Sequence, residues 1–302
     1  MRLLLDAIAR VAGVSSPATL DLRALFAAAP RAYHGSGVPR PWLFLRAGIL
    51  ALCIQGLLLL AWDQTGNRNL LPALIFVGST AAPMVTVLLC FECNVRRNVS
   101  LYAVSWLALL GGVLALLTAL LLYRLSDLLH LAWLGPALPA LVEEPAKLLG
   151  LVLVAGNLRW RGRLNGLLFG AAVGAGFSAL ESAGFAFRTA LVEGAPAMQE
   201  VIFQRGLLAP FSHVAWSAAV AAALWRVRGP RPFTAGMLLD ASFLRVSGLV
   251  LLLHCAWDAG GLLPWPVVYP ALGFIAWVVL AGFMVEELRD LRLEQGSILN
   301  PT

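Results

Sequence analysis

The sequence predicts an all-α protein, a polytopic transmembrane helical bundle with about eight spans. Of its 302 residues, 60% are hydrophobic and 13% are charged, whereas soluble domains carry roughly 25% charged residues. The apolar residues are gathered in runs of about 20, which is the length a helix needs to cross about 30 Å of hydrocarbon. These runs are continuous rather than alternating, and this pattern excludes a transmembrane β-barrel.

The chain divides into three parts. Residues 1–40 are expected to form a cytoplasmic or interfacial N-terminal segment of short amphipathic pieces. Residues 41–286 form one transmembrane domain with its motif-bearing core at 137–262, and residues 287–302 form a cytoplasmic C-terminal tail. The spans are expected at about residues 42–62, 70–91, 101–123, 137–156, 164–187, 207–225, 246–262 and 266–285.

Arginine residues orient the spans, because short loops rich in positive charge stay in the cytoplasm. Clusters follow the second, fourth and sixth spans, at Arg96 and Arg97, at Arg159, Arg161 and Arg163, and at Arg226, Arg228 and Arg231. Both termini should therefore face the cytoplasm, in a multi-pass protein of the cell (inner) membrane. The net charge of +6 is scattered over these short loops, so nucleic acid is not an expected partner.

Seven ionisable residues lie inside the spans that carry the motifs. Each costs roughly 2.5–3.5 kcal/mol to insert if it is Arg, Lys or Asp, so such residues are candidates for function. Lys147 is the sole lysine in the sequence. The seven are Glu143, Glu144, Lys147, Glu181, His213, His254 and Asp258.

The predicted topology places these residues at one depth. Glu143 and Glu144 lie about two turns inside the outer end of their span, and Glu181, His213 and His254 are similarly placed in the next three, at about 1.5 Å per residue. A single site near the extracytoplasmic face explains this shared depth. The span at 164–187 carries glycines at four-residue spacing, which permit close helix packing, and it should lie inside the bundle.

Helical spacing indicates how the charges are compensated. Lys147 is four residues from Glu143 and three from Glu144, so it can neutralise either carboxylate on the same helix. Pro145 should kink or loosen this helix beside the glutamates. Asp258 is four residues from His254 and can either orient the imidazole or join it as a metal ligand.

Two histidines with a carboxylate form a zinc ligand set that leaves one position for water, and a further glutamate can act as the general base. On this scheme Zn²⁺ is the expected cofactor. Glu181, His213 and His254 are the expected ligands, and Asp258 is a ligand or a partner of one. Glu143 is the expected base that activates the zinc-bound water, and Glu144 is able to share that role.

The ordered motifs resemble the PrsW family of intramembrane proteases, which is related to the CAAX prenyl proteases and bacteriocin-processing membrane proteases. Residues 143–147, EEPAK, resemble the family's EExxK motif, and residues 177–181, FSALE, resemble its FxxxE motif. His213 and His254 correspond to two later histidine motifs. The resemblance implies cleavage of a membrane-anchored protein, such as an anti-sigma factor, on the extracytoplasmic side of the bilayer.

Two other classes of protein compete with a protease. Intramembrane Glu, His and Lys also form proton relays, so a proton-coupled transporter is the main alternative. Transporters show paired broken helices, and only Pro145 interrupts a motif span in this sequence. A non-catalytic membrane scaffold or immunity protein is the third reading, and it would tolerate alanine at every site residue.

Overall fold

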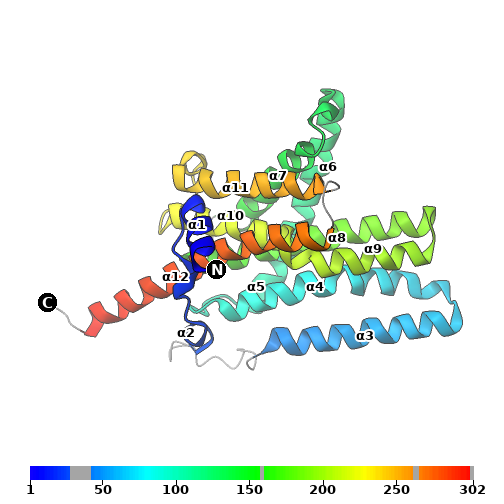
Figure 1. The fold of residues 1–302 in the computed structure, drawn as a ribbon, viewed down its shortest axis with the longest axis horizontal. Helices are drawn as coiled ribbons and strands as arrows, with labels where there is room; N and C mark the ends of the chain where they lie inside the picture. Colours follow the sequence, from blue (N-terminus) through cyan, green and yellow to red (C-terminus); the bar gives the residue numbers. More distant parts are fainter. Residues whose placement is uncertain (28–41, 157–159, 261–264, 300–302) are drawn as a thin grey trace.

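The computed structural model describes residues 1–27, 42–156, 160–260 and 265–299, and every regular element in these ranges is a helix (Figure 1). Seven helical segments are long and apolar enough to cross a membrane. Helix α7 (Ala137–Ala155) is also long enough, but it carries Glu143, Glu144 and Lys147. With α7 the count is eight, as predicted. The predicted segment 1–40 and the predicted span 246–262 both extend into residues outside the described ranges.

The helices follow the predicted order. The N-terminal segment contains α1 (Arg2–Ala12) and α2 (Leu22–Ala27), and the first two spans are α3 (Leu43–Thr65) and α4 (Leu71–Cys93). The third span combines α5 (Leu101–Trp106), the π-helical turn η3 (Leu107–Gly111) and α6 (Gly112–Leu128). After α7 come α8 (Arg163–Val192), α9 (Ala195–Leu208), α10 (His213–Arg228), α11 (Ala241–Asp258) and α12 (Trp265–Leu299).

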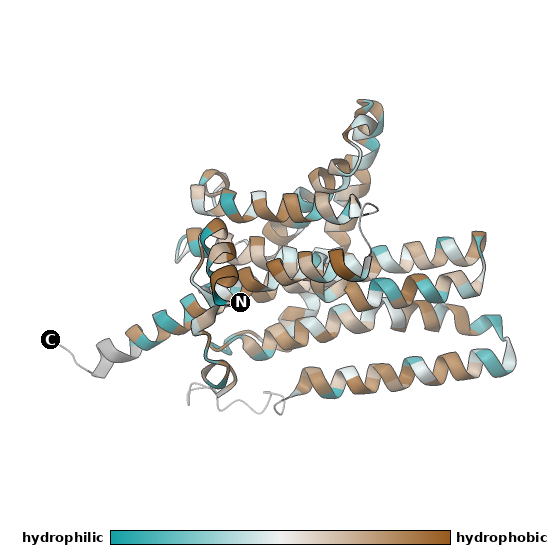
Figure 2. Ribbon diagram, in the orientation of Figure 1, coloured by the Kyte–Doolittle hydropathy of each residue, from teal (hydrophilic) through white to brown (hydrophobic). Residues whose placement is uncertain are grey.

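Helix α8 is the centre of the bundle, and 83% of its most apolar stretch is buried. A side-chain carbon built at Gly170 would lie 2.1 Å from the carbonyl oxygen of Ser217, and one at Gly174 would lie 2.4 Å from that of His213. The glycines predicted to form a packing face therefore let α10 approach α8 at backbone contact. By contrast α3, at the edge of the bundle, is apolar on its outward surface, as Figure 2 shows.

The sixth span is broken in its middle, which the sequence did not predict. It runs from Ala195 to Arg228 rather than over 207–225, and the helix is interrupted by the turn η5 (Ala209–Phe211) and by Ser212, whose φ and ψ of −118° and −121° are not helical. Pro210 has no amide hydrogen to continue the helix. Its carbonyl oxygen accepts a hydrogen bond from the Trp277 indole at 2.9 Å, which satisfies a backbone group freed by the break.

Proline has a different effect in α7, because the helix continues through Pro145, whose side chain faces outward. Helix α12 likewise continues across residues 286 and 287, where the C-terminal tail was expected to begin. Glu287 there is fully buried and pairs with Arg96 and Arg163. These ion pairs lie at the end of the bundle where both termini are found (Figure 1).

We predict that Gly176→Ala destabilises the fold. The added carbon would lie 1.9 Å from the carbonyl oxygen of Ala108, and such overpacking costs about 1–3 kcal/mol. Thermal unfolding of detergent-purified protein measures the effect. Gly184→Ala, in the same helix with no atom within 4 Å of the new carbon, should be neutral or stabilising. Equal stability of the two variants would contradict the packing described.

Candidate active site

The polar residues of α7 point into the bundle from consecutive turns. Glu143, Glu144 and Lys147 are buried, with exposed fractions of 5%, 8% and 1%. The Lys147 Nζ donates to Oε1 of Glu144 at 2.5 Å, so the predicted i,i+3 pair forms. The same Nζ lies 3.0 Å from Nδ1 of His213. Lysine therefore links α7 to the first residue of α10, just after the break.

The second histidine is held by the same carboxylate. Nδ1 of His254, on α11, lies 2.7 Å from Oε1 of Glu144. A carboxylate accepts hydrogen bonds only, so Nδ1 carries the proton and Nε2 presents its lone pair. That Nε2 lies 3.7 Å from Oε2 of Glu143 and 3.4 Å from Oδ2 of Asp258.

Glu181 holds the other histidine from the opposite side. Its Oε2 lies 3.1 Å from Nε2 of His213 and also pairs with Arg205 of α9. Since the Lys147 ammonium donates to Nδ1, the proton of His213 is assigned to Nε2, where Glu181 accepts it. Nδ1 of His213 faces Oε2 of Glu143 at 3.8 Å. Each imidazole thus has one nitrogen bound to an outer carboxylate and one directed at Glu143.

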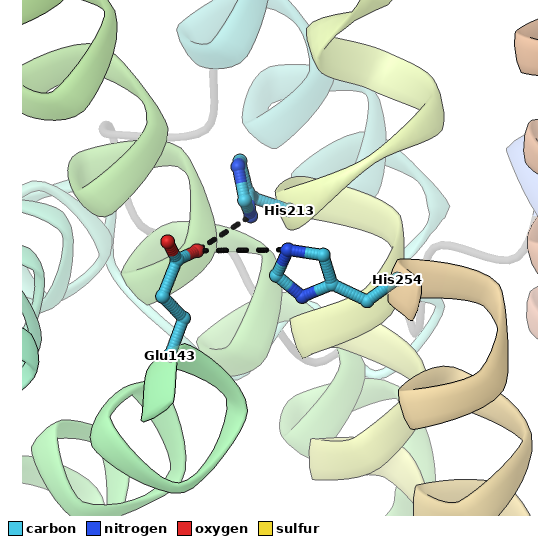
Figure 3. A group of neighbouring side chains, drawn as sticks. All are labelled: Glu143, His213 and His254. Atoms are coloured by element: carbon cyan, nitrogen blue, oxygen red, sulfur yellow. Dashed lines mark ion pairs between the residues drawn. The ribbon is translucent and has the colours of Figure 1, made fainter. Parts of the chain in front are cut away.

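The Glu143 carboxylate faces both rings from one side (Figure 3). Its Oε1 accepts a hydrogen bond from the Tyr123 hydroxyl of α6 at 2.8 Å. Its Oε2 is buried and has no hydrogen-bond partner among the residues the structure describes. Ligand atoms of Glu143, His213 and His254 lie within 4.8 Å of one another. The structure therefore gathers these three, and it places Glu181 and Asp258 outside the group, each beside one histidine.

Aromatic rings form the wall behind the histidines. The Trp216 ring centroid lies 5.4 Å from that of His213 and 4.6 Å from that of His254. Trp257 has Trp216 and Tyr269 as its ring neighbours in the described part of the chain. The fully buried Trp216 ring covers one side of the histidine pair.

A cavity of about 180 Å³ reaches His213 from the other side. Its lining is mixed: it includes the polar residues Ser178, Ser182, Gln204, Arg205 and Ser212 together with Leu208, Trp257 and Tyr269. Such a cavity provides room for water inside the span, as hydrolysis in a bilayer requires.

Comparison with known protein families decides the class of this site. The PrsW family intramembrane metalloprotease matches residues 97–285, which is more than half of the chain and includes every residue of the candidate site. The chain belongs to the PrsW family. It is accordingly an intramembrane endopeptidase and a multi-pass membrane protein, and its substrates are membrane proteins. No curated protein and no solved structure matched.

Family membership favours a protease over a transporter. One sequence observation that we held against a transporter was nevertheless wrong. Pro145 is not the sole interruption of a motif span, because the sixth span breaks at residues 209–212. In this PrsW-family protein α10 begins at His213, directly after the break. The position of the break therefore determines where His213 lies along the span.

Two residues in contact with the site were not recognised from the sequence. Tyr123 was expected near the end of the third span, and Arg205 was expected in an outer loop. Tyr and Arg are common at membrane interfaces as anchors, so neither residue type at those positions signalled a site. Helix α9 extends the sixth span beyond its predicted start and places Arg205 beside Glu181.

We predict that Lys147→Met destabilises this PrsW-family enzyme. Removing one partner of a buried ion pair leaves an uncompensated charge and costs about 3–5 kcal/mol. Thermal unfolding in detergent measures the change, and the double variant Glu144→Gln, Lys147→Met should recover part of the loss because it removes both charges. A single variant as stable as the wild type would show that the pair does not support the fold.

Proposed function

We propose that this PrsW-family enzyme hydrolyses a peptide bond of a membrane-anchored protein, with Glu143 as the base that takes a proton from the attacking water. The observation that carries the proposal is the buried Oε2 of Glu143, which has no hydrogen-bond partner in the described part of the chain and lies 3.8 Å from Nδ1 of His213 and 3.7 Å from Nε2 of His254. A general base needs an unoccupied acceptor atom within hydrogen-bond reach of the water.

Glu143 is prepared for this role by Tyr123. The hydroxyl hydrogen bond at 2.8 Å occupies Oε1 and fixes the carboxylate, so only Oε2 remains to receive a proton. The carboxylic acid formed there then returns the proton to the nitrogen of the leaving amine, as the general base becomes the general acid. Glu144 is less suited, because its Oε1 already accepts from Lys147 and His254.

The family's metal fits the histidine pair. Nδ1 of His213 and Nε2 of His254 face the same point, and their outer nitrogens are held by Glu181 and Glu144, an arrangement that orients metal-bound histidines in other proteins. We propose that these two nitrogens hold zinc, in exchange for the contact between Lys147 and His213. A zinc ion lowers the pKa of its water and polarises the scissile carbonyl.

The carboxylates beside the histidines have separate roles in this proposal. Glu181 contacts the outer nitrogen of His213, so we assign it to orienting that ring rather than to the ligand set. Asp258 lies 3.4 Å from the inner nitrogen of His254, and its side chain is 28% exposed. We propose it as the third ligand, which it would become by moving from its place outside the group toward the two histidines. Lys147 neutralises Glu144 and keeps that carboxylate ionised as an acceptor for His254.

The substrate is proposed to be a single-pass membrane protein of the anti-sigma factor class, cut near the extracytoplasmic face of the cell (inner) membrane. The arginine-rich ends of the spans gather at one end of the bundle with both termini, as the ion pairs of Arg96, Arg163 and Arg226 with α12 indicate. Positive charge favours the cytoplasm for that end. The site is displaced toward the opposite end, where α11 finishes at Asp258.

We predict that Glu143→Gln lowers the cleavage rate at least about 100-fold, the smallest effect typical of a lost general base. The assay uses a panel of tagged single-pass membrane proteins, including anti-sigma factors, reconstituted with the enzyme in lipid vesicles. Glu193→Gln, beyond the end of α8, is the matched control and should cleave like the wild type. Cleavage by Glu143→Gln within a few-fold of wild type would exclude Glu143 as the base.

Zinc content provides an independent test. We expect one zinc per chain in protein purified without added metal, and loss of that zinc in the His213→Ala, His254→Ala double variant. His130→Ala, at an exposed residue before a turn outside the site, should retain it. Zinc that persists in the double variant would place the metal elsewhere. Loss of zinc from Glu143→Gln would make Glu143 a ligand and overturn its assignment as the base.

A further inference from the structure

We propose that Arg205 is a positioning residue of this enzyme, which acts from α9 through Glu181 to hold the imidazole of His213. The inference rests on the proposed function and extends it across the break in the sixth span. Arg205 lies in α9, on one side of the break, and His213 begins α10 on the other side.

All the contacts of the Arg205 guanidinium reach one face of α8. One nitrogen pairs with Oε2 of Glu181, Nε donates to Oγ of Ser182 at 2.9 Å, and the group lies over the Phe185 ring at 4.6 Å from its centroid. The side chain is 30% exposed. An arginine within a span is costly, and here each of its contacts compensates part of that cost.

The contact with Glu181 reaches His213. The same Oε2 that pairs with Arg205 accepts from Nε2 of His213 at 3.1 Å. Because the guanidinium stays protonated in proteins, its ion pair holds the Glu181 carboxylate in place beside the histidine. A fixed acceptor at Nε2 leaves Nδ1 as the nitrogen that faces Glu143 and the metal position.

Charge balance adds a second argument. Four carboxylates approach the two histidines, at Glu143, Glu144, Glu181 and Asp258. Lys147 compensates Glu144, and Arg205 compensates Glu181. Glu143 and Asp258 are then left without a lysine or arginine partner among the residues that the structure describes, and a base requires such an uncompensated carboxylate.

A merely structural role would be to tie α9 to α8. Other residues tie these two helices together. Met198 and Ile202 of α9 pack with Ala186 of α8 and with Leu74 in a separate hydrophobic cluster. Met198 is fully buried in this cluster, and none of the cluster's members is a site residue. Met198→Ala therefore loosens the pair of helices without touching Glu181, and it serves as the matched control.

The test compares Arg205→Gln, Arg205→Lys and Met198→Ala in the vesicle cleavage assay, with the panel protein that the wild type cuts. We expect Arg205→Gln to lower kcat about 10- to 100-fold with KM within about twofold, and Arg205→Lys to restore part of the rate. Met198→Ala should lower thermal stability while it retains kcat. Equal kcat in Arg205→Gln and wild type, or an equal loss in Met198→Ala, would overturn the proposal.

A double-mutant cycle tests whether the effect passes through Glu181. If it does, Arg205→Gln combined with Glu181→Gln should be no slower than Glu181→Gln alone. Additive losses would contradict the proposed route. Failure of the proposed function has a different signature, which is undiminished cleavage by Glu143→Gln.

A measurement without substrate keeps the inference independent of the panel. Diethyl pyrocarbonate modifies unprotonated histidine, and mass spectrometry gives the rate at His213, which borders the 180 Å³ cavity. We expect at least a threefold faster reaction in Arg205→Gln, because a released imidazole is more accessible, and an unchanged rate in Met198→Ala. The same rate in both variants would show that Arg205 does not hold His213.

Discussion

The Glu144 carboxylate joins three helices in the buried interior of this protein. Its Oε1 accepts from Lys147 on its own helix and from His254 on α11, and Lys147 continues the contact to His213 on α10. Each of these groups would be costly to bury alone. As one connected set they satisfy one another, so the position of every member depends on the others. The free acceptor at Glu143 exists because its neighbours are already paired.

Such a set can form only if the helices approach closely. Side chains from α7, α8, α10 and α11 meet at one depth, and α8 and α10 are in backbone contact at Gly170 and Gly174. Larger residues at these positions would separate α10 from α8, and with it His213 from Glu181. The glycine spacing in α8 and the position of Glu181 are therefore parts of one requirement, because Gly174 and Glu181 lie about two turns apart on the face of α8 that meets α10.

The fold could be predicted from the sequence because burial in lipid imposes long apolar runs, and all eight spans were located. The sequence also indicated which ionisable side chains the fold brings together, since charges inside spans are rare, while their roles in catalysis and metal binding stay predictions. The predictions failed where the local backbone conformation interrupts or extends a helix. Pro210 was placed near the start of a span, where proline is tolerated, and not within one. Arg205 and Tyr123 were missed for the related reason that span ends were set too short.

Lys147 has a practical consequence as the sole lysine side chain of the sequence. Its exposed fraction is 1%, and its ammonium is enclosed by Glu144, His213 and the faces of Phe177 and Trp216. An amine-selective acylating reagent therefore has one side-chain target in this chain, and that target is closed in the structure described. The yield of the labelled side chain would report directly how often the interior of the bundle opens.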